Sequence, residues 1–150
     1  MTPFVYIKQI CDLDGGGTSD ALIGMSRAYE LALVTYRHQG GTALYGMLQP
    51  FAARVMCIED DEFPFRNSAV ENTFEDVNSV ARVTTYNTKI EIEKALLALF
   101  SNQKYMSAQQ FYAHFMHIYP FYYGNYRIAS LFFNLLNGTI ISPVNPKNKE

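Results

Sequence analysis

Hydrophobic residues recur at intervals of three and four along most of the chain, which is the pattern of helices with one buried face. Helices are predicted on this basis over residues 20–38, 43–57, 89–100, 107–118 and 126–136. In the last segment the spacing assigns one buried stripe to Ile128, Leu131, Phe132 and Leu135. The pattern therefore predicts an all-α bundle.

Capping residues mark the ends of several of these segments. Thr18 or Ser19 is expected to cap the first helix, because a hydroxyl can accept a hydrogen bond from an unpaired backbone N–H there. The glycines at 40–41 are expected to end it. Ser107 and Gln110 have the spacing of a capping box at the start of a later helix.

Three other features interrupt the helical pattern. Thr42 is predicted to cap the helix over 43–57, and Pro50 should kink or split it because proline lacks the backbone donor. Residues 12–18, with their three glycines, are expected to form a loop. The β-branched run at 83–88 is compatible with one short hairpin or with a simple connection.

The most informative stretch is the loop at 120–125, which leads from one predicted helix into the next. A glycine-containing loop at a helix N-terminus directs several backbone N–H groups and the positive end of the helix dipole at one small volume. Such a volume can hold phosphate. Arg127, in the first turn of the second helix, could add a planar cation.

Residues 119–130 resemble the signature of the Fic/Doc (Fido) family, H-x-F-x-[D/E]-G-N-G-R-x-x-R. The matching positions are Phe121, Gly124, Asn125 and Arg127. The differing positions are Tyr119 for the histidine, Tyr123 for the acid, Tyr126 for the second glycine and Ser130 for the second arginine. The resemblance is therefore to a degenerate form of the signature.

The resemblance implies a nucleotide site, with ATP as the candidate ligand, at Gly124, Asn125, Tyr126 and Arg127. In the family the histidine takes the proton of a target hydroxyl, which then accepts AMP. Tyr119 stands at that position, and a phenol is a poor general base at neutral pH. Tyr123 stands where the family has the acid that would hold Mg²⁺, so the resemblance implies that this ligand is lost.

A second segment, residues 67–72, resembles the family's inhibitory motif, [S/T]-x-x-x-E-[G/N]. Asn67 stands at the Ser/Thr position, Glu71 at the glutamate and Asn72 at the last position. In the family that glutamate reaches the second arginine of the signature, which is Ser130 here, so this ion pair cannot form. Taken without the resemblance, Glu71 is expected to be a surface glutamate on a helix.

The expected architecture is one Fic-like domain over residues 1–150. It would contain N-terminal helices over 1–66, a motif-bearing core over 67–144 and a frayed polar tail over 145–150. A hairpin near 83–88 would correspond to the family's flap.

Composition narrows the classes of protein. Hydrophobic residues make up 49% of 150 residues and aromatic residues 15%, which is enough for a buried core. A net charge of −2 does not predict the basic surface that nucleic-acid binding requires. The sequence contains no predicted membrane span and no recognisable signal peptide, so we expect a cytoplasmic protein, or one exported without such a signal. A homo-oligomer is compatible with all of this.

The cysteine and histidine residues have no metal-binding pattern. Cys11 and Cys57 lack a metal or redox spacing, and the sequence leaves open whether they pair. His114 and His117 lie one turn apart on a predicted helix without a third ligand, so exposed or partly packed histidines are expected.

Three functions remain open from the sequence. The preferred one is a degenerate Fic relative that transfers nucleotide poorly or not at all and acts by binding nucleotide or a protein partner. The alternative is an active adenylyltransferase that moves AMP from ATP to a protein hydroxyl. The second alternative is a structural interaction module whose pocket is filled by the tyrosines of the loop.

Overall fold

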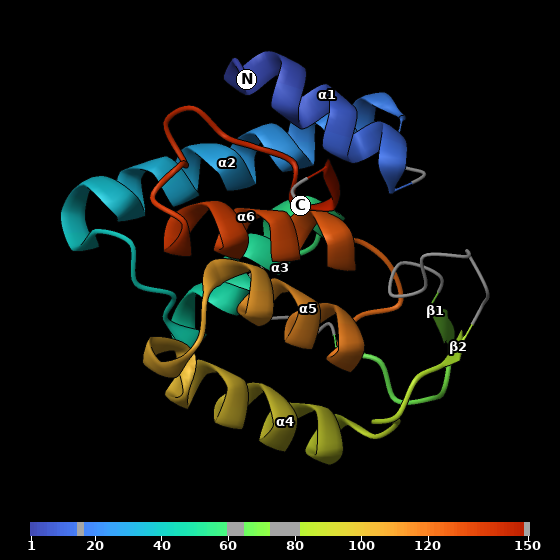
Figure 1. The fold of residues 1–150 in the computed structure, drawn as a ribbon. Helices are drawn as coiled ribbons and strands as arrows, with labels where there is room; N and C mark the ends of the chain where they lie inside the picture. Colours follow the sequence, from blue (N-terminus) through green and yellow to red (C-terminus); the bar gives the residue numbers. More distant parts are fainter. Residues whose placement is uncertain (15–16, 60–64, 73–81, 149–150) are drawn as a thin grey trace.

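The computed structural model describes residues 1–14, 17–59, 65–72 and 82–148, which form a helical bundle with one short hairpin (Figure 1). The α-helices are α1 (Pro3–Leu13), α2 (Ser19–Gln39), α3 (Leu48–Met56), α4 (Lys89–Ser101), α5 (Ala108–Ile118) and α6 (Asn125–Leu136). Three short 3-10 helices are η1 (Tyr45–Met47), η2 (Gln103–Tyr105) and η3 (Pro146–Asn148). The antiparallel strands are β1 (Glu71–Asn72) and β2 (Arg82–Val83).

The predicted all-α class with one short hairpin is confirmed. The hairpin involves the start of the β-branched run, since Val83 pairs with Glu71. Residues 73–81, which connect the strands, lie outside the described residues. None of the helices in the described part is both long and apolar enough to cross a membrane.

Helix α6 lies at the centre of the bundle, in contact with α1, α2, α3 and α5 (Figure 1). Every residue from Asn125 to Leu135 is buried. The predicted stripe is therefore buried as expected, but the helix has no solvent-facing side. The helix is buried on all sides because α1, α2, α3 and α5 surround it.

Phe132 on α6 organises the aromatic part of the core. Its ring lies 5.2 Å from the rings of Phe51 on α3 and Phe100 on α4, measured between centroids. Phe111 and Phe115 on α5 lie at 6.1 and 6.0 Å. Because aromatic pairs at such distances contribute beyond the area they bury, α6 is fixed firmly against three neighbouring helices.

The predicted caps at Thr18, Gly40 and Ser107 are confirmed, but the predicted cap at Thr42 is wrong, because η1 begins at Tyr45 and α3 at Leu48. The Thr18 hydroxyl accepts a hydrogen bond from the Ala21 N–H at 3.2 Å, and Gly40 ends α2 with φ of 73°. Ser107 and Gln110 form both hydrogen bonds of the capping box. These local signals were sufficient to place the ends of α2 and the start of α5.

The helix predicted over residues 43–57 is shorter than expected. Residues 45–47 form η1, and α3 begins only at Leu48. Pro50 therefore lies in the first turn of α3, where its missing N–H would have no helical partner anyway. Pro50 limits where the helix can begin and does not bend it.

Helix α1 extends into the segment that was expected to be a loop. Thr2 caps it and Pro3 occupies its first position. Asp12 and Leu13 are helical, and Asp14 follows directly as the C-cap residue. Of the predicted loop, Gly15 and Gly16 lie outside the described residues.

The expected frayed tail is wrong for Asn145 and Pro146, which are buried. Asn145 is 2% exposed and accepts a hydrogen bond from the Tyr126 hydroxyl through its side-chain oxygen. Just before it, Val144 exchanges two 2.9 Å hydrogen bonds with the Asn134 side chain on α6. The polar composition of this segment reflects hydrogen bonding to α6, which sequence alone does not distinguish from exposure.

Candidate functional site

The loop between α5 and α6 forms the bend that the sequence predicts (Figure 1). Helix α5 ends at Ile118, Tyr119 adopts a left-handed conformation with φ of 50°, and Gly124 precedes α6 with φ of 81°. A Cβ at Gly124 would lie 3.1 Å from Cγ1 of Val55. Both the backbone angle and this close approach favour glycine, so the bend depends on it.

Asn125 shapes the loop from inside. Its Oδ1 accepts a hydrogen bond from the Phe121 N–H at 3.0 Å, and its Nδ2 donates to the Phe121 carbonyl at 2.8 Å. Asn125 is 1% exposed, and Phe121 is fully buried against Phe65. Asn125 thus holds the loop in its bent conformation.

Asp14 fills the anion-binding position at the start of α6. Its Oδ2 accepts a hydrogen bond from Nε of Arg127 at 2.8 Å, and the two side chains are 7% and 5% exposed. The backbone N–H of Arg127 also lowers the pKa of this carboxyl. Arg127 is the third residue of α6, so its N–H is one of those left without a partner inside the helix. The chain's own carboxylate therefore lies where the sequence suggested phosphate.

The sequence analysis missed Asp14. Nothing in its sequence surroundings connects it with Arg127, which is 113 residues away. The signal present was only an acidic residue next to three glycines, which is typical of an ordinary turn. The pairing arises because α1 packs against α6 and ends beside that helix's N-terminus.

The tyrosines at the family's catalytic positions are not arranged for proton or metal chemistry. Burial raises the pKa of the half-buried Tyr119, with the Asp14 charge adding to the shift, so its phenol is protonated at neutral pH. Tyr123 is 54% exposed and supplies no carboxylate. Tyr126 is fully buried, and its hydroxyl donates to Asn145.

The described residues do not fit a Mg²⁺–nucleotide group at this loop. A carboxylate already accepts from Nε of Arg127, and like charge would oppose phosphate beside it. No group of three or more His, Cys, Asp or Glu residues in the described ranges could hold a metal ion. The predicted loss of the metal ligand stays a prediction.

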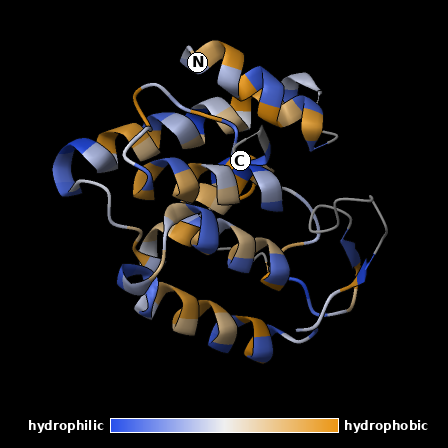
Figure 2. Cartoon of the chain, viewed as in Figure 1, coloured by the Kyte–Doolittle hydropathy of each residue, from blue (hydrophilic) through white to orange (hydrophobic). Residues whose placement is uncertain are grey.

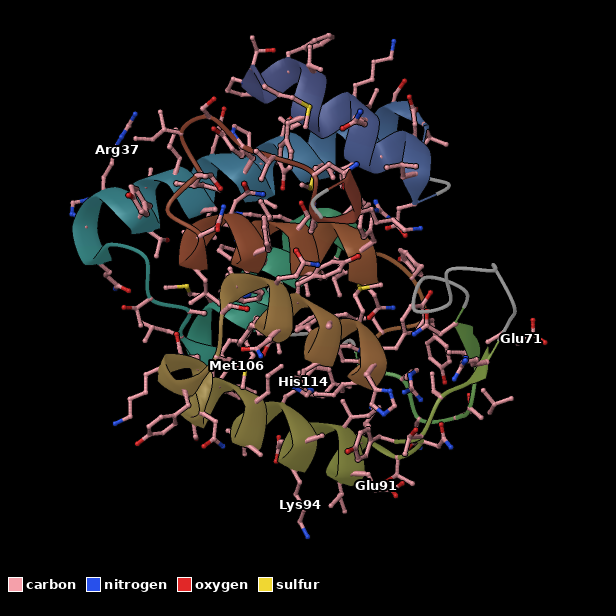
Figure 3. The ribbon with its side chains drawn as sticks, in the orientation of Figure 1. Arg37, Glu71, Glu91, Lys94, Met106 and His114 are labelled. Carbon is pink, nitrogen blue, oxygen red and sulfur yellow. The ribbon has the colours of Figure 1, made fainter. Side chains whose placement is uncertain are left out.

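The two residues of the inhibitory-like motif lie apart from the loop's arginine. Glu71 is on β1 rather than on a helix and points into solvent (Figure 3). Asn72 is 2% exposed and donates from Nδ2 to the Met116 carbonyl at 2.7 Å, which joins the hairpin to α5. Ser130 is buried, with its hydroxyl 2.5 Å from that of Tyr6 on α1. Glu71 and Ser130 are not brought together.

Arg66 is a second residue that the sequence analysis missed, and its side chain is fully buried. Its Nε donates to the Tyr119 carbonyl at 2.5 Å and its Nη2 to the Ile118 carbonyl at 2.9 Å. Its Nη1 donates to the Ser68 carbonyl at 3.0 Å and to Oδ1 of Asn87 at 3.1 Å. Burial lowers its pKa, and the negative end of α5 offsets part of that cost. Arg66 thereby fixes the end of α5 from which the loop starts.

The two histidines of α5 are exposed, and the two cysteines do not form a disulfide. His114 and His117 are exposed on α5, and His117 lies edge-on to the Tyr86 ring at 6.1 Å. Cys11 is buried, Cys57 is exposed, and both are free thiols. The question left open by the sequence is therefore answered: the two cysteines do not pair.

The buried carboxylate gives a pH-dependent prediction. Burial raises the pKa of Asp14 above its usual range, although the Arg127 guanidinium and N–H lower it. A carboxyl with a raised native pKa holds its proton more tightly in the folded state. This contribution to stability is fully present below the unfolded pKa of about 4 and is lost as pH rises through the folded pKa.

The Asp14→Asn variant lacks this carboxyl group, so its stability has no contribution from the titration of residue 14. Lowering the pH from 7 towards 4 is therefore expected to increase the stability of the wild type relative to Asp14→Asn, measured by urea unfolding of both proteins at each pH. A change in the opposite direction would mean that the attraction of Arg127 exceeds the cost of burial.

Comparisons with protein-family models, with curated proteins and with solved structures found no match to this chain. The family resemblance consequently stays a prediction based on the residues of the loop. The geometry defines the class of fold, a helical bundle in which the N-terminus of the central helix is covered by an internal ion pair.

Proposed function

We propose that the protein is a non-catalytic helical binding module that acts through protein contacts rather than through nucleotide transfer. The observation that carries this proposal is the buried pair between Asp14 and Arg127, whose carboxylate lies at the N-terminus of α6. In terms of the Fic/Doc resemblance, the protein would be a degenerate relative in which this site is filled from within.

The neighbouring side chains support the same proposal. Transfer of a nucleotidyl group depends on positioning, charge neutralisation and a base near the working pH. Tyr119 is protonated at neutral pH, Arg127 is already paired, and Tyr126 is directed into the core towards Asn145. No described side chain at the loop remains to perform these steps.

An experiment with nucleotides tests the proposal directly. We expect no heat of binding when the full chain is titrated with ATP, ADP or AMP, with and without Mg²⁺, in isothermal titration calorimetry. We also expect no labelled protein after incubation with α-labelled ATP and Mg²⁺. Saturable nucleotide binding would contradict the filled site, and transfer of label to the chain would establish the adenylyltransferase alternative.

A further inference from the structure

The hydroxyl of Tyr122, in the loop between α5 and α6, lies next to two hydrogen-bond donors. It accepts a hydrogen bond from the Asn67 N–H at 3.1 Å and lies 3.0 Å from the Ser68 hydroxyl, which can also donate to it. The Tyr122 side chain is 51% exposed. Both hydrogen bonds are at the surface, so the hydroxyl can leave them to contact another molecule.

The rest of the fold holds these two donors in place. The Arg66 N–H donates to the Pro120 carbonyl at 3.0 Å, and the Arg66 side chain donates to the Ser68 carbonyl at 3.0 Å. Oδ1 of Asn67 accepts from the N–H of Lys89, the first residue of α4, at 3.2 Å. Figure 1 places the segment that leads into β1 beside the end of α5, and Figure 2 shows the start of this segment as hydrophilic. The donors are therefore positioned before any ligand arrives.

The charges around this hydroxyl favour a negative group. The Ser68 hydroxyl and the Asn67 N–H hold the pKa of the Tyr122 phenol below its usual value. The positive charges of Arg66 and Lys89 lower this pKa further. Arg66 is buried, whereas Lys89 is exposed at the start of α4, where the helix dipole adds a partial positive charge. An anionic group at Tyr122 is thus stabilised by donors and by cations together.

Two other exposed tyrosines lack this environment. Tyr105 is 74% exposed and Tyr123 is 54% exposed. Neither hydroxyl forms a hydrogen bond with any residue in the described ranges. Lys104 lies over the ring of Tyr105, with Nζ 5.0 Å from the centroid. Exposure therefore does not distinguish Tyr122 from these two residues, whereas the donors and charges at its hydroxyl do.

We propose that Tyr122 is a phosphorylation site and that Lys89 binds the phosphate. A phosphate ester carries about −1.5 to −2 charges at pH 7 and three acceptor oxygens, so it can accept from Asn67 and Ser68 in place of the phenol. In the reaction, Oη of Tyr122 bonds to the γ-phosphorus of ATP while the bond from that phosphorus to the β-phosphate oxygen breaks. ADP leaves, and the phenolic proton passes to the catalytic aspartate of a separate tyrosine kinase. This modification site does not depend on the proposed binding function.

Treatment of the full chain with ATP, Mg²⁺ and the catalytic domain of a broad-specificity tyrosine kinase tests the site. Tandem mass spectrometry should find about tenfold more phosphate on Tyr122 than on Tyr105 or Tyr123, which serve as internal controls. Tyr122→Phe should remove most of the incorporated phosphate and leave the circular dichroism spectrum unchanged. Equal phosphate on the three tyrosines, or none on Tyr122, would overturn the proposal.

Thermal melting of the phosphorylated chain tests the role of Lys89. Phosphorylation of the wild type should raise the melting temperature by about 1–3 °C, because the phosphate pairs with Lys89 and the start of α4. Lys89→Gln should lose this rise. Lys94→Gln is the matched control and should keep it, because Lys94 is exposed on α4 and points away from the bundle (Figure 3). No rise in the wild type, or an equal rise in Lys89→Gln, would refute the pairing with Lys89.

Discussion

Replacing Arg66 with methionine is expected to lower the free energy of unfolding by about 4 kcal/mol, as measured by urea or guanidinium denaturation. The fully buried guanidinium donates to three backbone carbonyls and one side-chain amide. Methionine can fill much of the volume but supplies no donor, so the three carbonyls would lose this partner, whereas Oδ1 of Asn87 still accepts from the Thr84 hydroxyl. Each buried acceptor left in this way costs about 1–3 kcal/mol, part of which relaxation recovers.

Two further variants separate the geometry of Arg66 from its charge. Arg66→Lys keeps the charge but not the planar fork, so it should lose most of the same stability. Arg37→Met removes an arginine that is exposed on α2 and points away from the bundle (Figure 3). It should change stability by no more than about 0.5 kcal/mol. If Arg66→Met stayed within that range as well, the carbonyls at the end of α5 would not depend on this side chain.

Replacing Asp14 with alanine is expected to destabilise the protein by about 3–5 kcal/mol, because it leaves the buried Arg127 guanidinium without the oxygen that accepts its hydrogen bond. Arg127 is 4% exposed, and its side-chain ion pair is with Asp14. Adding Arg127→Met should recover much of the loss, since the remaining side chains would then be uncharged. Denaturant unfolding of the single and double variants measures this coupling.

Asp12→Ala is the matched control, because Asp12 lies in the same turn of α1 but is exposed. It should change stability by no more than about 0.5 kcal/mol. Inorganic phosphate should raise the melting temperature of Asp14→Ala but not of the wild type, because only the variant leaves Arg127 and the α6 N-terminus open to an anion. Equal stability of Asp14→Ala and Asp12→Ala would show that the buried pair contributes nothing.

The bend before α6 could be predicted because its signals are local. Gly124 supplies the positive φ, and the residues after it repeat at helical spacing. The caps at Thr18 and Ser107 were predictable for the same reason, since a hydroxyl can satisfy an N–H two or three residues away. The backbone conformation at the candidate site could therefore be predicted from the sequence.

Two of the expectations that failed concern segments whose neighbours are distant in the chain. Glu71 is on a strand because its segment pairs with residues beyond 81, which overrides any local preference. Asn145 is buried because α6 offers it the Tyr126 hydroxyl. A polar residue that is hydrogen-bonded inside and one that is exposed look alike in a sequence.

The sequence by itself determined the helical class, most of the helix ends and the turn at Gly124, because periodicity, capping and backbone freedom act within a few residues. Only the tertiary structure decided what occupies the start of α6. Asp14 and Arg127 lie 113 positions apart, and their charges meet only when α1 packs on α6. Whether a helix N-terminus is open to a ligand or covered by the chain itself depends on that packing.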